Sequence, residues 1–229
     1  PGKEARRKFK DIQTRIKKTS RPSRKLKVEL KNARRDVIMS AYYDDAVRLS
    51  EKLARWFIEI EKKGNHRFAI CTGGGPGIME AANLGAKKAG GISVGLNISL
   101  PMEQYPNPYQ TRELSFEFHY FFIRKFWFFY LAKALVVFPG GFGTLDEFFE
   151  LVTIIQTGKS KKTMPVILFG SEYWNDVMNI EKMAYWGTIS PDDLNLFRVI
   201  DNVDEAFEYL KKELTRLYLN STSPMRHKK

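Results

Sequence analysis

The stretch ALVVFPGGFGTLDEFFE (residues 134–150) joins an apolar run to a glycine-rich turn and then to an acidic segment. Residues 134–138 have the length and apolar character of a buried strand of a parallel sheet. Three glycines follow within four positions, and the spacing of apolar residues after them predicts a helix to about Gln156. A strand, a glycine turn and a helix in this order form the repeating unit of α/β folds, with the turn at the carboxyl end of the strand.

The same unit occurs upstream, where residues 67–72 predict a strand, 73–77 a turn and 78–90 a helix. Apolar strands and amphipathic helices alternate along the rest of the chain, which predicts an α/β fold: a Rossmann-like doubly wound parallel sheet with helices on both faces. The other predicted strands are 91–98, 114–120, 135–138, 164–170 and 197–200, and the other predicted helices are 42–63, 121–134, 173–187 and 203–219.

A fold of this class opens with a strand, but none precedes the helix predicted to begin at Tyr42. The run DVIM (36–39) is too short and leads directly into that helix. We therefore expect that a first strand and its loop are missing from the chain between Met39 and Ser40.

Positive charge is concentrated at the start of the chain. Residues 1–35 hold 15 Lys and Arg against 3 Asp and Glu, whereas the remaining residues balance at 23 of each. We predict a basic N-terminal arm (1–39), a single Rossmann-like domain (40–219) and a C-terminal tail (220–229). The arm lacks interleaved aromatic residues and any nucleic-acid motif, so a solvated helix or a disordered tail is expected rather than a nucleic-acid partner. A salt-sensitive contact with nucleic acid is the open alternative.

Composition excludes several classes of site. One cysteine, Cys71, permits no internal disulfide and indicates a reducing, cytoplasmic setting; its apolar strand predicts a core position. The longest apolar run, residues 116–138, contains charged residues and is not a membrane span. His66, His119 and His227 show no metal-ligand spacing, so neither a metal nor a cofactor is expected.

The first glycine loop, TGGGPGIME (72–80), has small residues at a strand end and a helix N-terminus with free N–H groups. We predict that Gly74, Gly75 and Gly77 bind substrate, and Glu80 is a further candidate in this loop. Glu80 stands where a dinucleotide fingerprint needs its third glycine. A tight turn without a ligand is the structural alternative.

The second loop is also a glycine-rich turn between a strand end and a helix N-terminus. We predict that its residues Gly140, Gly141, Gly143 and Thr144 bind a phosphate. Thr144 can cap the following helix, and the spacing Thr144-x-x-Glu147 is also that of a capping box, which would explain Glu147 without chemistry. Acidic residues at 146, 147 and 150 exceed what capping requires. Two such loops facing one crevice indicate a ligand with two parts.

Arg124 and Lys125 lie in the very apolar run FFIRKFWFFY (121–130). A guanidinium in such surroundings is costly unless it meets an anion, so both residues are candidates for an anion clamp. The alternative is that both side chains extend along the apolar surface to reach solvent.

These residues together resemble a known family. The segments TGGGPGIMEAANLGA (72–86), RK (124–125) and PGGFGTLDE (139–147), in this order, resemble the Lonely Guy family of nucleoside 5′-monophosphate phosphoribohydrolases, many of which were once labelled "lysine decarboxylase". The resemblance covers about residues 41–215. The proline-rich loop at 100–110 is similar to the longer branch of the family, so cytokinin nucleotides are not the expected natural substrate.

The resemblance implies a Rossmann-like homodimer or higher oligomer that releases base and ribose 5-phosphate from AMP-like or cytokinin riboside monophosphates. It implies that residues 40–219 form a nucleotide-binding catalytic domain, that Arg124 and Glu147 are catalytic, and that Gly140 to Thr144 bind phosphate and ribose. Lys125 would be a weaker anion ligand, and Glu80 is a candidate to contact a ribose hydroxyl. A carboxylate beside the ribose would stabilise the positive charge that grows as the glycosidic bond breaks. A nucleotide-binding carrier on the same fold, without turnover, is the alternative. Decarboxylase chemistry would need a pyridoxal phosphate site with a Schiff-base lysine, for which no motif is present.

Overall fold

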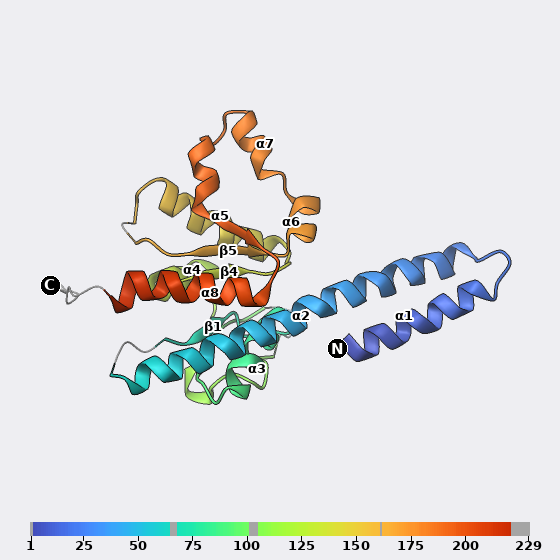
Figure 1. Ribbon diagram of the computed structural model, residues 1–229, viewed down its shortest axis with the longest axis horizontal. Helices are drawn as coiled ribbons and strands as arrows, with labels where there is room; N and C mark the ends of the chain where they lie inside the picture. Colours follow the sequence, from blue (N-terminus) through green and yellow to red (C-terminus); the bar gives the residue numbers. More distant parts are fainter. Residues whose placement is uncertain (1, 65–67, 101–104, 161, 221–229) are drawn as a thin grey trace.

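The computed structural model describes residues 2–64, 68–100, 105–160 and 162–220 (Figure 1). Helices and parallel strands alternate as the sequence predicts, so the α/β class is confirmed. The strands are β1 (Ile70–Thr72), β2 (Ser93–Ile98), β3 (Ser115–Phe118), β4 (Leu135–Val137), β5 (Val166–Phe169) and β6 (Arg198–Ile200). The α-helices are α1 (Gly2–Lys17), α2 (Arg24–Lys62), α3 (Ile78–Lys88), α4 (Phe121–Leu131), α5 (Phe142–Gln156), α6 (Ser171–Val177), α7 (Ile180–Tyr185) and α8 (Val203–Leu214).

The strands form two parallel three-stranded sheets rather than one continuous ladder. One sheet has the order β1-β2-β3 and the other β4-β5-β6. These are the two halves of a doubly wound sheet, whose chain moves outward from the centre in each half. In the described structure β1 and β4 are both edge strands, because no strand lies between them to pair with both.

The sequence predicts that a first strand and its loop are missing between Met39 and Ser40. In the structure that segment is helical: α2 runs from Arg24 to Lys62, and Met39 and Ser40 are consecutive residues within it. The Ser40 hydroxyl donates a hydrogen bond to the Val37 carbonyl, as in an uninterrupted helix. The boundary predicted between residues 39 and 40 thus falls inside α2.

The basic arm is a helical hairpin. Figure 1 shows α1 folding back along the first half of α2, which projects beyond the rest of the molecule. Ile12 and Ala33 are buried in the seam between the two helices, and Ser23 caps the start of α2 by accepting a hydrogen bond from the Leu26 N–H. Few acidic residues pair with the basic residues of the arm; one that does is Asp44, which lies 3.9 Å from Arg6. Of the two forms expected for the arm, the structure has the solvated helix.

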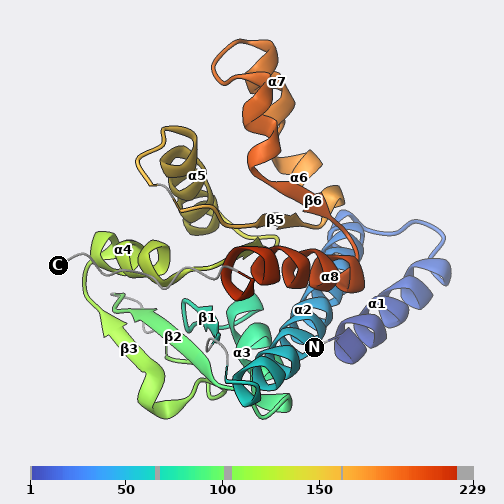
Figure 2. The same cartoon turned by 60° about the vertical axis from the view of Figure 1, so that its left-hand side comes forward.

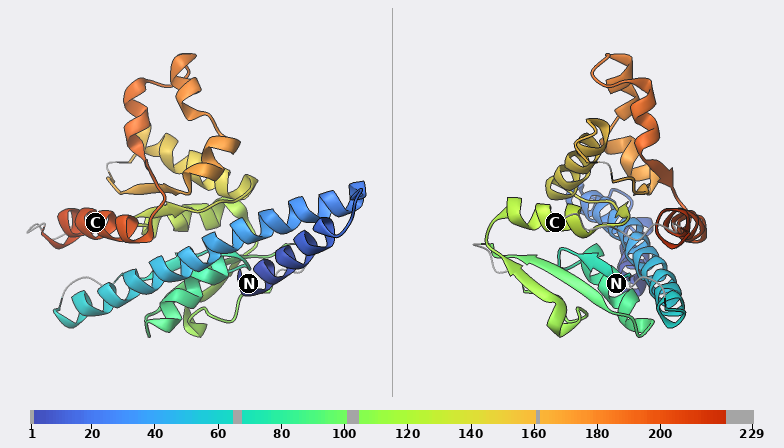
Figure 3. Two further views of the ribbon diagram at one scale, coloured as in Figure 1. Left: turned by 45° about the vertical axis from the view of Figure 1, so that its right-hand side comes forward. Right: turned by 90° about the vertical axis from the view of Figure 1, so that its left-hand side faces the viewer.

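Helices cover both faces of the sheets, as Figures 2 and 3 show. The second half of α2 packs against α3 and α8 over the shared core, and Gly85 of α3 admits the α2 backbone, because a Cβ there would overlap the Val47 carbonyl. A second core lies under α5, where Phe148 is fully buried against β4 and β5. This framework places the ends of β1 and β4, with their glycine loops, near one another in the middle of the fold.

Candidate functional site

The first glycine loop follows β1 as predicted and leads into α3. Gly74 and Gly77 have φ values of +74° and +73°, a backbone region that disfavours side chains. The Gly74 N–H donates to the Thr72 hydroxyl at 3.0 Å, and Gly77 is the N-cap of α3 without a capping side chain. The N–H groups of the first helical turn therefore remain available for a ligand.

The second loop follows β4 and leads into α5. The helix begins at Phe142 with Gly141 as its N-cap, and no side chain caps it. Thr144 therefore lies inside the first turn, so the expectation that it caps the helix is wrong and Glu147 is not part of a capping box. The Thr144 side chain instead lies against Gly140, whose carbonyl accepts a hydrogen bond from the Tyr173 hydroxyl at 2.7 Å.

Arg124 connects the two loops. A guanidinium nitrogen of Arg124 lies 3.4 Å from a carboxylate oxygen of Glu147, one turn into α5. Another guanidinium nitrogen would lie 3.7 Å from a Cβ at Gly73 of the first loop. The Arg124 side chain is 12% exposed, so the alternative in which it extends to solvent is wrong.

The surroundings of Arg124 leave part of its charge unsatisfied. Its guanidinium lies over the rings of Phe121 and Phe128, at 5.3 and 5.8 Å from their centroids. Its Nε is buried and has no hydrogen-bond partner among the described residues. A buried donor without a partner is unfavourable, and an anionic ligand would relieve it.

The Glu147 carboxyl is 35% exposed at its side chain and occupies the centre of this arrangement. Burial raises the pKa of Glu147 above its ordinary value of 4.5, and the nearby Arg124 acts in the opposite direction. Asp146 and Glu150 raise the pKa further, whereas Lys125 lowers it. A carboxylate that is partly desolvated and held next to a guanidinium is suited to meet a developing positive charge.

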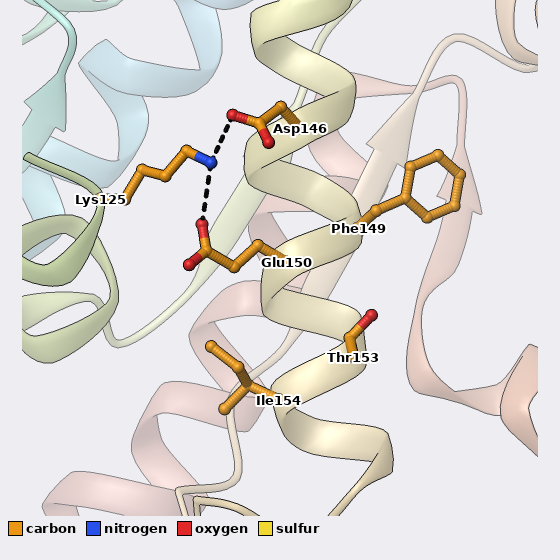
Figure 4. Close-up of a pocket in the computed structure, with 6 residues that line it drawn as sticks. All are labelled: Lys125, Asp146, Phe149, Glu150, Thr153 and Ile154. Carbon is orange, nitrogen blue, oxygen red and sulfur yellow. Dashed lines mark ion pairs between the residues drawn. The ribbon is translucent and has the colours of Figure 1, made fainter. Parts of the chain in front are cut away.

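Lys125 pairs with acidic residues of α5 other than Glu147. Its ammonium pairs with Asp146 at 2.5 Å and with Glu150 at 3.3 Å, as Figure 4 shows. The hydrogen bond that the Lys125 ammonium donates to the Asp146 carboxylate is the main cause that raises the pKa of Lys125. The three residues line an open cavity of about 390 Å³ together with Phe149, Thr153 and Ile154, and neither Arg124 nor Glu147 lines it. The role of Lys125 as an anion ligand stays a prediction, and would require exchange of these carboxylates for the ligand.

Glu80 lies in the first turn of α3, as expected, and has a protein partner. Its carboxylate accepts a hydrogen bond from the Tyr43 hydroxyl of α2 at 2.9 Å. Burial and this hydrogen bond raise the pKa of Tyr43, so the hydroxyl stays a donor. A contact between Glu80 and a ribose hydroxyl stays a prediction.

Cys71 corrects one expectation. The residue lies in β1 but is exposed rather than in the core, because β1 is an edge strand in the described structure. Among the described residues there is no group of His, Cys, Asp and Glu that could hold a metal ion. His66 and His227 lie outside the described residues. No helix within the described ranges is long and apolar enough to cross a membrane.

Asparagine and glutamine side chains pack behind the first loop, which the sequence reasoning missed. Asn107 and Gln110, from the proline-rich segment, bind the loop carbonyls, and Asn83 of α3 is fully buried beneath them. The available signal was NPY at 107–109 in an otherwise unassigned loop, since buried amides occur where backbone groups need partners.

The sequence of this chain is similar to that of a curated enzyme. The chain is 27% identical over 168 residues to the pyrimidine/purine nucleotide 5′-monophosphate nucleosidase of Escherichia coli K12, an alignment that covers 66% of this chain and 35% of that protein. The chain thus spans about a third of the length of the curated relatives it matches.

Solved structures with a similar fold include two proteins linked to the molybdenum cofactor. The molybdenum cofactor binding protein of Rippkaea orientalis superposes with a TM-score of 0.52 at 20% identity, covering 75% of this chain and 86% of that one. The Moco carrier protein of Chlamydomonas reinhardtii gives 0.52 at 21% identity, with 78% and 90% covered. At these identities the likeness is one of fold.

The family model described as "possible lysine decarboxylase" matches residues 79–210, which is more than half of the chain. The match includes Glu80, Arg124, Lys125 and the whole of the second glycine loop. It carries the older label that the sequence resemblance implies. The chain belongs to this family.

Proposed function

We propose that the protein hydrolyses the N-glycosidic bond of a nucleoside 5′-monophosphate and releases a free base and ribose 5-phosphate. The observation that carries the proposal is the pair of Arg124 and Glu147, held at 3.4 Å beside two glycine loops. The likeness to a nucleotide 5′-monophosphate nucleosidase supports it. Because that relative is longer than this chain, substrate and activity are proposals for this protein.

The chemistry assigns a separate task to each part of the site. As the bond between C1′ and the base nitrogen breaks, positive charge develops on the ribose ring, and water supplies the oxygen that binds C1′. The departing base takes the bonding electrons and a proton. Glu147 stabilises the ring charge or orients the water, and Arg124 holds phosphate or ribose.

The phosphate is assigned to the second loop and the start of α5. Phe142 begins the helix, so N–H groups of Gly141, Gly143 and Thr144 lie at a free helix N-terminus, where the helix dipole attracts anions. Binding energy from this remote group can position the ribose without taking part in the bond cleavage.

Incubation with AMP, GMP, CMP, UMP and isopentenyladenine ribotide, followed by chromatography for free base, tests the proposal. Release of base from any of them, together with an equal amount of ribose 5-phosphate, would support hydrolysis and identify the preferred base. If a folded protein binds these nucleotides and releases no base, the hydrolase proposal fails. That result favours a nucleotide carrier, which the fold likeness to cofactor carriers also allows.

The pH dependence of the reaction should report Glu147. Burial raises its folded-state pKa above 4.5, so ionising the carboxyl in the folded protein is unfavourable and its charge is lost on acidification at a higher pH than for an exposed glutamate. We therefore expect kcat/KM to fall on the acid side with an apparent pKa above the ordinary range near 4.3. A profile that stays flat down to the ordinary glutamate pKa would contradict the assignment.

We also propose that two copies associate through α4. Phe122, Phe126 and Tyr130 on this helix are 71%, 56% and 58% exposed, and such a patch is typical of protein interfaces. Light scattering should give about twice the chain mass of 26.6 kDa. Phe122→Glu should shift the mass towards one chain, whereas Tyr185→Glu, at a site 73% exposed on α7, should leave it unchanged. A wild-type monomer would contradict the proposal.

We likewise propose that the chain divides into a basic arm, one catalytic domain and a tail, and that it acts in the cytoplasm. The single cysteine at position 71 is compatible with a reducing compartment.

A further inference from the structure

The backbone of the first glycine loop is held from behind by the proline-rich segment that follows β2. The Gly74 carbonyl accepts hydrogen bonds from the backbone N–H of Asn107 at 2.8 Å and from the Gln110 side-chain amide at 2.8 Å. The Asn107 side-chain amide also lies 2.9 Å from the Gly74 carbonyl and 3.0 Å from that of Gly75. Both loop carbonyls are therefore turned towards this segment.

The amide side chains behind the loop are buried and hydrogen-bonded to one another. Asn107 is 7% exposed, and its side chain also donates to the side-chain oxygen (Oδ1) of Asn83 at 2.9 Å. The same Asn83 oxygen accepts from the Thr72 hydroxyl at 2.8 Å. The Asn83 Nδ2, on a residue with no exposed surface, has no partner among the described residues. A buried donor without a protein partner is unfavourable, and it lies directly beneath the loop.

The same side-chain amides account for two of the glycines near this loop. A Cβ at Gly74 would overlap the Asn97 side chain, and a Cβ at Gly95 of β2 would overlap the Gln110 amide. Both positions are therefore glycine because side-chain amides fill the space. With its carbonyls engaged behind, the loop leaves the N–H groups of Gly75, Gly77 and the first turn of α3 without an acceptor in the described part of the chain.

We propose that Asn107 and Gln110 are positioning residues for substrate. They hold the carbonyls of Gly74 and Gly75 away from the crevice, so that the loop presents N–H donors to the acceptor oxygens of the nucleotide's ribose phosphate. This inference rests on the proposed function for the identity of the ligand, but it concerns binding and can be tested without turnover.

The first test measures binding of ribose 5-phosphate, AMP and inorganic phosphate by calorimetry to wild type, Asn107→Ala and Gln110→Ala. Asn107→Ala should raise the Kd for ribose 5-phosphate about tenfold or more, because the Gly75 carbonyl loses its side-chain donor and the Gly74 carbonyl loses one of its three donors. Gln110 is half-buried, so Gln110→Ala should fold and weaken binding to a smaller degree. If the Kd for inorganic phosphate rises as much as the Kd for ribose 5-phosphate, the N–H groups of the loop bind the phosphate. If only the Kd values for ribose 5-phosphate and AMP rise, these N–H groups bind the ribose.

Ser93→Ala is the matched control. Ser93 is 1% exposed and its hydroxyl donates to the Tyr109 carbonyl at 3.1 Å, so it supports the same segment without touching the glycine loop. We expect Ser93→Ala to keep the wild-type Kd even where it lowers the melting temperature as much as Asn107→Ala does. Unchanged Kd values in folded Asn107→Ala and Gln110→Ala would overturn the inference, as would equal weakening by Ser93→Ala.

Kinetics provide the second readout. A residue that positions a binding loop should raise KM and leave kcat within about threefold, since ground and transition states lose the same contact. A fall in kcat with unchanged KM would overturn the positioning role. If wild type binds ribose 5-phosphate and Asn107→Ala weakens it, while no nucleotide is hydrolysed, the inference holds and the hydrolase proposal fails. If wild type binds none of the three probes, the inference is overturned.

Discussion

Replacing Glu147 by glutamine is expected to lower kcat for nucleotide hydrolysis by about a thousandfold or more, the scale seen when a group that meets transition-state charge is removed. The amide keeps the shape of the side chain and can still accept a hydrogen bond from Arg124, which lies 3.4 Å away. It has no negative charge to stabilise the ribose cation. Binding of ribose 5-phosphate should change far less, because in the proposed arrangement the glycine loops, and not Glu147, hold the phosphate.

Single-turnover base release and calorimetry on the same preparations measure the two effects. Glu208→Gln, at an exposed position of α8, is the control for a glutamate outside the site and should keep wild-type rates. If Glu147→Gln retains more than about a tenth of the wild-type kcat, Glu147 is not the catalytic carboxylate. A loss of binding equal to the loss of rate would instead indicate that Glu147 holds the substrate.

Replacing Arg124 by alanine should lower kcat/KM by about a hundredfold to a thousandfold. The change removes the cation that partners Glu147 and leaves that carboxyl partly buried without it, so its pKa should rise further. The acid side of the pH profile should therefore move to higher pH. Arg124→Lys should not restore activity, since an ammonium cannot reproduce the planar fork that reaches both Glu147 and the loop at Gly73.

The control for this change is Arg216→Ala, which removes an exposed arginine paired with Glu213 near the end of the described chain. It should leave kinetics and pH profile unchanged. An Arg124→Ala variant with normal kcat/KM, or with an acid limb that does not move, would contradict the role assigned to the guanidinium. Circular dichroism of each variant separates a loss of fold from a loss of function.

The order of strands and helices could be predicted from local patterns alone. Buried parallel strands read as short apolar runs and amphipathic helices as periodic ones, so the strands from β1 to β6 were located close to where they occur. The one helix predicted over 173–187 is instead two helices, α6 and α7, and the helix predicted over 203–219 is α-helical only to Leu214. The two glycine loops were found at strand ends for the same reason, because a short run of residues carries the whole signal.

Local patterns gave the wrong prediction for the role of Thr144 and for the burial of Cys71. The sequence Thr144-x-x-Glu147 fits a capping box, but the helix begins two residues earlier, at Phe142 with Gly141 as its N-cap. Cys71 reads as a core residue because its neighbours in the sequence are apolar, yet its exposure depends on whether another strand pairs with β1. Start positions of helices and strand neighbours are decided by the surrounding structure.

By itself the sequence determined the alternation of elements, the basic arm and the identity of the charged residues near the glycine loops. Tertiary structure decided which charges meet: Arg124 and Glu147 belong to α4 and α5, and the two side chains come within 3.4 Å only in the folded protein. It also decided that Asn107 supports a loop more than thirty residues before it, at Gly74. Such contacts depend on distances across the fold, and these follow from packing, which no periodicity along the chain encodes.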